Sequence, residues 1–151
     1  MNARIYFCLL FCFVYISCNI CSFFGANDLG NKFVLLEGDR DSDRVIVFCT
    51  TPSGCCDAGI PVVPSRAMNY GKEYVVAASF DERWIVARTQ ILNSEREAFW
   101  IVDKNFELDI ENCDKINCDS IIQAHVSGPL DFNSLQERKR ELGIGFKIES
   151  R

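Results

Sequence analysis

The chain has 151 residues, of which 48% are hydrophobic and 25% are charged, and its formal net charge is -5. This length and composition predict a single folded domain and argue against a disordered chain. They also argue against a nucleic-acid partner or a surface for anionic lipid. The one basic run, residues 138–140, lies between two glutamates and is typical of a solvated helix face.

The start of the chain has the pattern of an export signal. Arg4 precedes an uncharged run at residues 5–16, IYFCLLFCFVYI. A basic start followed by a short apolar run is typical of a signal peptide, here residues 1–17. The run is short for a transmembrane helix, which needs about 17 to 25 apolar residues. A retained membrane anchor is the alternative, if the apolar run continues through Phe24.

The apolar run closes with Tyr15, Ile16, Ser17 and Cys18. These residues resemble the lipobox of bacterial lipoproteins, in which an aliphatic and a small residue precede an invariant cysteine. The resemblance implies cleavage before Cys18, palmitate-type acyl chains on that residue, and attachment to a membrane of the cell envelope on its periplasmic or cell-surface side. Several acyl chains hold a protein stably where a single chain is marginal. Residues 18–30 are then the lipidated cysteine and a tether.

The nine cysteines are divided by this processing, because Cys8 and Cys12 leave with the signal peptide and Cys18 takes the lipid. Six cysteines remain, an even number in a compartment where disulfides form. They include two close groups, and pairing of Cys49 with either of its neighbours stays open. The disulfide candidates are Cys49, Cys55, Cys56, Cys113 and Cys118, and Cys21 is the sixth remaining cysteine.

Two alternatives to disulfides are unpaired buried thiols and a metal site. Zinc sites usually combine two cysteine pairs whose members lie about two to four residues apart. Here five residues separate Cys49 from Cys55, four separate Cys113 from Cys118, and His125 is the only histidine. We therefore favour disulfides and expect no metal site.

Short runs of β-branched and aromatic residues predict strands in the first half of the mature chain. KFVLLE at 32–37 and RVIVFC at 44–49 flank the polar segment GDRDSD, which predicts a turn. Residues 50–66 are rich in proline and glycine. They indicate an irregular segment with an edge strand around Val62.

The clearest pattern is a hairpin, in which EYVVAASF and RWIVARTQ are joined by two acidic residues. Alternation in the second arm puts Trp84, Val86 and Arg88 on one face and the intervening residues on the other. Both faces are expected to be partly covered. AFWIVDK at 98–104 continues the sheet, and SIIQAHV at 120–126 is predicted as a further strand.

One helix is predicted near the end of the chain. Residues 134–137 match a capping box, Phe132 is placed to staple the start, and Gly143 is placed as the C-cap. Alternating apolar residues at 144–148 predict a closing strand. The fold class is therefore predicted as α+β, with a single globular domain at residues 31–151. We expect a mostly antiparallel sheet of about six strands with one C-terminal helix.

Three segments carry a resemblance to a known family: FWIVDK at 99–104, GPLDFNSL at 128–135 and ERKRELGI at 137–144. They are similar to the DUF3997 family, small bacterial lipoproteins of uncharacterised function. The resemblance supports the predicted lipid anchor in a membrane of the cell envelope. It implies no activity and no catalytic residues. The cysteine loop at 113–118 departs from the family pattern as an insertion.

No catalytic constellation stands out in the sequence. His125 lies in a predicted strand, where a hydrogen-bonded structural histidine is the usual role. Asp103 is predicted to end a strand, and the acidic pairs lie in predicted turns. Glycine-rich phosphate loops and nucleophile elbows are absent from the sequence. We predict that the protein is not an enzyme and uses no cofactor.

The remaining class is a membrane-anchored, exported lipoprotein that acts as a non-catalytic binding or interaction module for an unknown protein partner. One form is an immunity-type inhibitor that neutralises a basic toxin through complementary charge. The alternatives are an envelope structural or assembly lipoprotein, or a small enzyme with an unrecognised site. Four aromatic residues form either a binding patch or, as the stronger expectation, part of the core: Tyr74, Trp84, Phe99 and Trp100.

Overall fold

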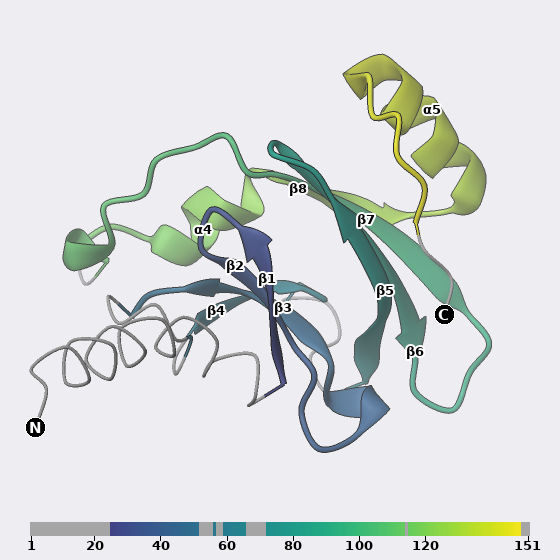
Figure 1. Cartoon of the computed structure of the whole chain (residues 1–151), viewed down its shortest axis with the longest axis horizontal. Coiled ribbons are helices and arrows are strands. Elements are labelled where there is room, and N and C mark those ends of the chain that lie inside the picture. The colour runs from purple at the N-terminus through teal and green to yellow at the C-terminus, as the bar shows by residue number, and fades with distance from the viewer. Residues whose placement is uncertain (1–24, 52–55, 57–58, 66–71, 114, 149–151) are drawn as a thin grey trace, which may run out of the picture.

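The structure is a computed structural model that describes residues 25–51, 56, 59–65, 72–113 and 115–148. The predicted signal peptide, Cys18 and most of the predicted tether lie outside these residues. Two sheets and a C-terminal helix follow one another as layers (Figure 1). Within the described ranges, no helix has the length and hydropathy needed to cross a membrane.

The first sheet is a four-stranded antiparallel meander with the order β1-β2-β3-β4. Its register pairs Phe33 with Phe48, so these two apolar side chains lie together on one face. The predicted turn between the second and third strands is a short 3-10 helix, η1 (Asp41–Asp43). The strands are β1 (Ala26–Gly30), β2 (Phe33–Leu36), β3 (Val45–Cys49) and β4 (Gly59–Val63).

The second sheet is also a four-stranded antiparallel meander, in the order β5-β6-β7-β8. The predicted hairpin forms its first two strands. The carboxylate of Asp81 accepts hydrogen bonds from the backbone amides of Arg83 and Trp84, at 2.8 and 2.7 Å, and so fixes the turn. The strands are β5 (Glu73–Phe80), β6 (Trp84–Ile91), β7 (Glu97–Asp103) and β8 (Val126–Leu130).

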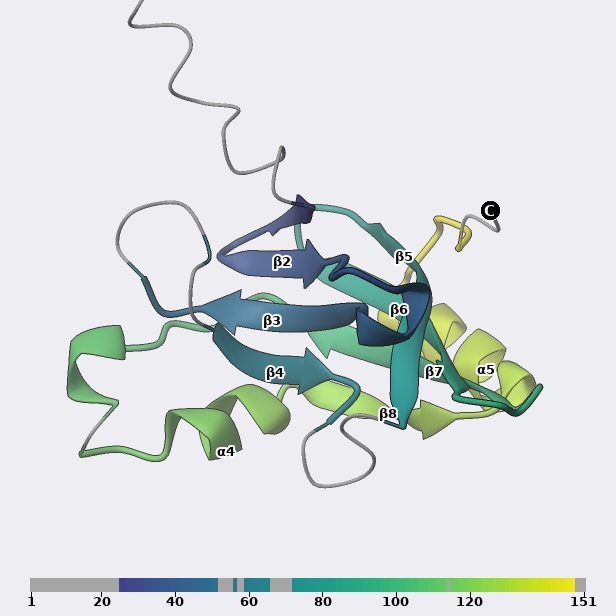
Figure 2. The ribbon, with the colours of Figure 1, turned by 90° about the horizontal axis from the view of Figure 1, so that it is seen from below.

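The first sheet lies over the second (Figure 2), and one apolar cluster fills the space between them. Trp100 is its largest member and is 1% exposed. Its Nε1 donates to Thr89 Oγ1 at 2.9 Å, and that hydroxyl donates to the carboxylate of Glu73. These buried polar groups are therefore paired with one another. The cluster comprises Leu29, Phe33, Leu35, Ile46, Phe48, Val62, Val63, Val75, Ile85, Ala87, Trp100, Val102 and Ile122.

The opposite face of the second sheet is covered by the C-terminal helix α5 (Phe132–Leu142), which lies over β7 (Figure 1). The alternation predicted for β6 is confirmed, because Ile85 and Ala87 enter the cluster between the sheets while Trp84 and Val86 face the helix. This second cluster is smaller. It comprises Trp84, Val86, Phe99, Ile101, Leu135 and Ile144.

The α+β class, the antiparallel pairing and the C-terminal helix are confirmed, but the prediction of about six strands in one sheet is wrong. The described residues form eight strands in two sheets. β1 lies inside residues 18–30, which were assigned to the tether. Leu29 is its only buried residue, so the segment lacks the apolar alternation that marks a strand.

The strand predicted at residues 120–126 is wrong, because this segment begins as helix α4 (Cys118–Gln123). The side chain of Asn117 accepts a hydrogen bond from the Ser120 amide at 3.0 Å and caps the helix. Cys118 and Ile122, one helical turn apart, are the buried residues. A short apolar run is compatible with a strand and with a buried helix. Here the buried residues are spaced by one helical turn, and the segment is a helix.

The N-terminus of α5 and the segment after the helix also differ from the prediction. Its N-cap is Asp131, whose carboxylate accepts from the Ser134 amide at 2.8 Å, so the helix begins before the predicted capping box. The predicted C-cap, Gly143, is confirmed and has a φ of 71°. Residues 144–148 form no strand, because they pack on the face of the second sheet and not beside a strand edge.

Candidate functional site

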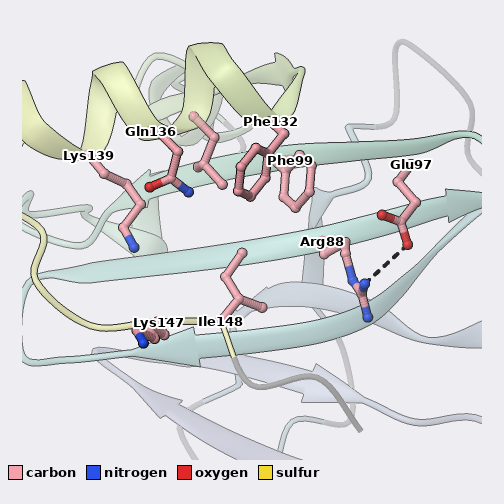
Figure 3. Close-up of a pocket in the computed structure, with 9 residues that line it drawn as sticks. Arg88, Glu97, Phe99, Phe132, Gln136, Lys139, Lys147 and Ile148 are labelled. Carbon is pink, nitrogen blue, oxygen red and sulfur yellow. Dashed lines mark ion pairs between the residues drawn. The ribbon is translucent and has the colours of Figure 1, made fainter.

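A cavity of about 590 Å³ lies between α5, the outer face of the second sheet and the segment after the helix, and we call it the α5 pocket (Figure 3). Four apolar side chains form much of its wall: Phe99 from β7, Phe132 and Leu135 from α5, and Ile148. Leu135 is 1% exposed, whereas Phe132 is 60% exposed and stands at the mouth. The volume falls within the range of about 300–1,000 Å³ that is usual for small-molecule sites.

The pocket exists because the apolar core under α5 stops part-way along β6. Trp84 and Val86 fill the helix-facing side of this strand, and the next residue on that side is Arg88. Arg88 lies opposite Phe99 in the register. Its Nη1 forms an ion pair with Glu97 Oε1 at 3.1 Å instead of packing under the helix. The space that an apolar side chain would occupy therefore stays open.

The charges around the α5 pocket do not balance. Arg88 and Glu97 neutralise each other, whereas Lys139 and Lys147 form no ion pair with a carboxylate of the described residues. In Figure 3 the two lysines lie on the side of the pocket away from the Arg88–Glu97 pair. One end of the pocket is therefore locally positive, although the chain as a whole has a formal net charge of -5.

Lys139 connects α5 to the segment that closes the pocket. The residue is only 9% exposed, and its Nζ donates to the backbone oxygen of Phe146 and lies 5.6 Å from the centroid of that ring. Burial lowers the pKa of the Lys139 amine. Because an ammonium group carries three donors, Lys139 keeps donors for a further acceptor beside the one bond to Phe146.

A second cavity, of about 410 Å³, lies beside η1 and β5, and its lining combines charged and apolar side chains. Its lining includes Asp43, Arg44 and Glu73. Arg44 Nη1 donates to the backbone oxygen of Val76 at 2.9 Å, and the Arg44 guanidinium lies 3.8 Å from the Glu37 carboxylate. Because charges of both signs line this cavity, it gives no clear preference for one class of ligand.

His125 does not line the α5 pocket. Its ring stacks on Phe106, with centroids 4.4 Å apart, and its backbone oxygen accepts from the Asp103 amide at 2.9 Å. The Asp103 carboxylate binds Arg83 at 3.1 Å and the Asn105 amide at 3.0 Å. Burial by itself would raise the pKa of Asp103, but these hydrogen bonds hold it below its ordinary value. The His125 ring and the Asp103 carboxylate thus have separate structural partners.

Two of the predicted disulfides are present in the structure. Cys49 pairs with Cys56, and Cys113 pairs with Cys118, with sulfur–sulfur distances of 2.07 and 2.03 Å. The first bond closes the segment between β3 and β4, and the second closes the loop before α4. Five cysteines named in the sequence analysis lie outside the described residues: Cys8, Cys12, Cys18, Cys21 and Cys55.

The four aromatic residues expected either in a binding patch or in the core do not share a surface. Trp100 lies between the sheets, while Trp84 and Phe99 lie under α5. Tyr74 is half-buried, and its hydroxyl donates to Gln90 at 3.0 Å. Core packing, the stronger expectation, is therefore confirmed for Trp84, Phe99 and Trp100, although Phe99 also lines the α5 pocket.

The α5 pocket itself was missed at the level of sequence. Of its lining residues, Phe99 is the one that the sequence analysis names as a candidate for a binding surface. Two signals were present in the chain. Arg88 occupies a helix-facing position of β6, and Lys139 follows Leu135 by one helical turn, on the side of α5 that faces the sheet.

Comparison with known proteins identified no relative. No protein-family model matches the chain, no curated protein matches it, and no solved structure matches it. The resemblance to the DUF3997 family therefore stays a prediction. Within the described ranges, no three histidine, cysteine, aspartate or glutamate side chains are grouped so that they could hold a metal ion.

Proposed function

We propose that the protein is an exported, membrane-anchored binding module that holds an apolar ligand in the α5 pocket and catalyses no reaction. The observation that carries this proposal is the open apolar space between α5 and β7, walled by Phe99, Phe132 and Leu135. A pocket built on a helix and a sheet is preorganised, because regular elements hold its walls without a ligand.

The exported and anchored part of the proposal is supported by the start of the chain. The signal-peptide pattern at residues 1–17 and the lipobox-like sequence before Cys18 point to a lipid anchor. The two disulfides add independent support, since disulfides form and persist in oxidising compartments outside the cytosol.

The non-catalytic part is supported by the polar residues that line the pocket. Covalent or acid–base catalysis needs a nucleophile and a base within reach of each other. The carboxylate in this lining is that of Glu97, which Arg88 already holds in an ion pair. Lys139 is bound to a backbone oxygen and not to a base.

Photolabelling of the full-length protein in phosphatidylcholine nanodiscs tests the binding function. The probe is tetradecanol that carries a diazirine, and mass spectrometry locates the labelled residues. We expect saturable labelling of peptides that contain Phe99 or α5. Gln136→Trp, at a residue that lines the pocket, should lower this labelling by about tenfold or more by filling the space.

Glu137→Trp is the matched control, because Glu137 is an exposed residue of the same helix that does not line the pocket. It should leave labelling unchanged. Equal loss of labelling in the two variants, or no loss in Gln136→Trp, would show that the α5 pocket is not the binding site.

The anchor is tested by the intact mass of the protein from membranes of its native host, before and after reduction and alkylation. A mass that matches residues 18–151 with added acyl chains supports the proposed address. An unprocessed mass with free thiols contradicts it. Immunity-type inhibition and an envelope structural role remain separate predictions, and the former rests on the net charge, the small size and the predicted anchor.

A further inference from the structure

The α5 pocket combines an apolar wall with an unbalanced positive end, and this combination identifies a class of ligand. Resting on the proposed binding function, we propose that the pocket takes a single-chain anionic amphiphile, a long-chain carboxylate. Its alkyl chain lies along Phe99, Phe132 and Leu135, and its carboxylate binds Lys139 and Lys147.

The two lysines at one end of the pocket favour an anionic ligand. Arg88 is already neutralised by Glu97, but Lys139 and Lys147 have no carboxylate partner in the described part of the chain. Lys139 is buried beside an apolar wall, where an ammonium group gains more from an anionic partner than it would in bulk water. An acidic head group therefore fits this end of the pocket.

The floor of the pocket argues for an alkyl chain and against a peptide. The floor is the face of β6 and β7, whose backbone groups are already paired within the sheet. A peptide in the pocket would find no free strand edge to satisfy its own amides, and burying unpaired amides is unfavourable. A hydrocarbon chain brings no such groups.

A second copy of the chain is a poorer occupant. A symmetric contact through this face would bring the lysines of both copies toward one another, and like charges repel. The cavity also lies over the sheet between α5 on one side and the segment with Lys147 and Ile148 on the other (Figure 3), a shape that fits a slender ligand. The Phe132 side chain at the mouth of the pocket is largely exposed, so an alkyl chain can enter beside it.

The ligand class is tested with two probes of equal length, diazirine-bearing tetradecanoate and diazirine-bearing tetradecanol, on the full-length protein in nanodiscs. The half-saturating concentration for labelling the α5 pocket should be about tenfold lower for the carboxylate. Shortening the carboxylate should weaken labelling by up to about fourfold for each methylene removed.

Lysine variants test the orientation of the ligand. Lys139→Gln and Lys147→Gln should each raise the half-saturating concentration of the carboxylate by about tenfold and leave that of the alcohol nearly unchanged. Arg140→Gln is the matched control, because it removes one positive charge from an exposed position of α5 outside the pocket and should change neither value. Lys147→Gln keeps the test valid if Lys139→Gln loosens the segment bound through Phe146.

The outcomes separate this inference from the binding function. Equal labelling by the alcohol and the carboxylate, with both lost in Gln136→Trp, would overturn the anionic class and keep the binding function. Labelling by neither probe would overturn both. An effect of Arg140→Gln as large as that of Lys147→Gln would mean that net charge and not the pocket selects the carboxylate, and would overturn the proposed orientation.

Discussion

The two faces of the second sheet are packed in different ways. On the inner face, Trp100 and its neighbours fill the space against the first sheet, and even the polar groups of Thr89 and Glu73 are bonded to one another. On the outer face, the cluster under α5 is smaller and gives way to a cavity at Arg88. One strand pair therefore takes part in a filled core on one side and an open pocket on the other.

This difference assigns separate roles to the two faces. A filled interior holds a fold together, because removing any part of it leaves unfilled space. An unfilled interior contributes less to folding and can accept a ligand. We therefore expect substitutions between the sheets to change stability, and substitutions around the α5 pocket to change binding more than stability.

Trp100→Ala should have the largest effect, lowering the free energy of unfolding by about 3–5 kcal/mol. The change opens a cavity between the sheets and removes the hydrogen bond to Thr89. Urea unfolding followed through the fluorescence of Trp84, the remaining tryptophan, measures it. A larger loss in Leu135→Ala, under α5, would reverse the proposed ranking of the two faces.

Gly128→Ala should lower the free energy of unfolding by about 3 kcal/mol, through backbone strain and overpacking. Gly128 has a φ of 151°, and a Cβ there would lie 2.6 Å from the ring of Trp100 and 2.9 Å from the backbone oxygen of Phe99. Gly145→Ala is the matched control, because no atom lies within 4 Å of its added Cβ. Equal unfolding midpoints for the two variants would contradict this account.

Much of the fold could be predicted because strand alternation is a local signal. Residues of β6 alternate between two apolar environments, and both disulfides follow from cysteines that are close in sequence. β1 and α4 were missed for a different reason. β1 is held by its pairing with β2 and has little apolar pattern, and α4 is too short for its period to be distinguished from that of a strand.

The α5 pocket could not be predicted because a cavity is a property of three elements together. Phe99, Leu135 and Ile148 lie far apart in sequence and become neighbours only after α5 docks on the sheet. Each of them reads as an ordinary core residue in its own segment. The unusual residue is Arg88, and its meaning depends on knowing that a helix and not solvent covers this face of β6.

Replacing Cys113 and Cys118 with serine should lower the free energy of unfolding by about 2 kcal/mol, as expected for opening a short disulfide loop. The bond holds the start of α4, whose Ile122 belongs to the cluster between the sheets. Chemical denaturation of the double variant measures this change. Photolabelling of the α5 pocket should be unaffected, and a loss of labelling would mean that the two faces are coupled.

Phe132→Ala should lower the free energy of unfolding by about 1 kcal/mol or less, because the side chain is 60% exposed and its ring meets that of Phe99 edge-on, with centroids 5.9 Å apart. Its effect on the labelling of the α5 pocket should be larger, since Phe132 forms part of the pocket wall. Normal labelling of the α5 pocket together with a large loss in the free energy of unfolding would show that Phe132 stabilises the core and does not contact the ligand.

The smallest expected effect is a dependence of stability on pH through Lys139. Burial lowers the pKa of this amine in the folded state, so protonation opposes folding. The cost is fully present below the lowered pKa, and it disappears as the pH rises from that value to the ordinary value of 10.5. Methionine has no titratable group. The free energy of unfolding of the native protein, relative to that of Lys139→Met, should therefore increase as the pH rises over that range. A carboxylate bound at Lys139 favours the protonated amine and should reduce this pH dependence, whereas a neutral ligand should not.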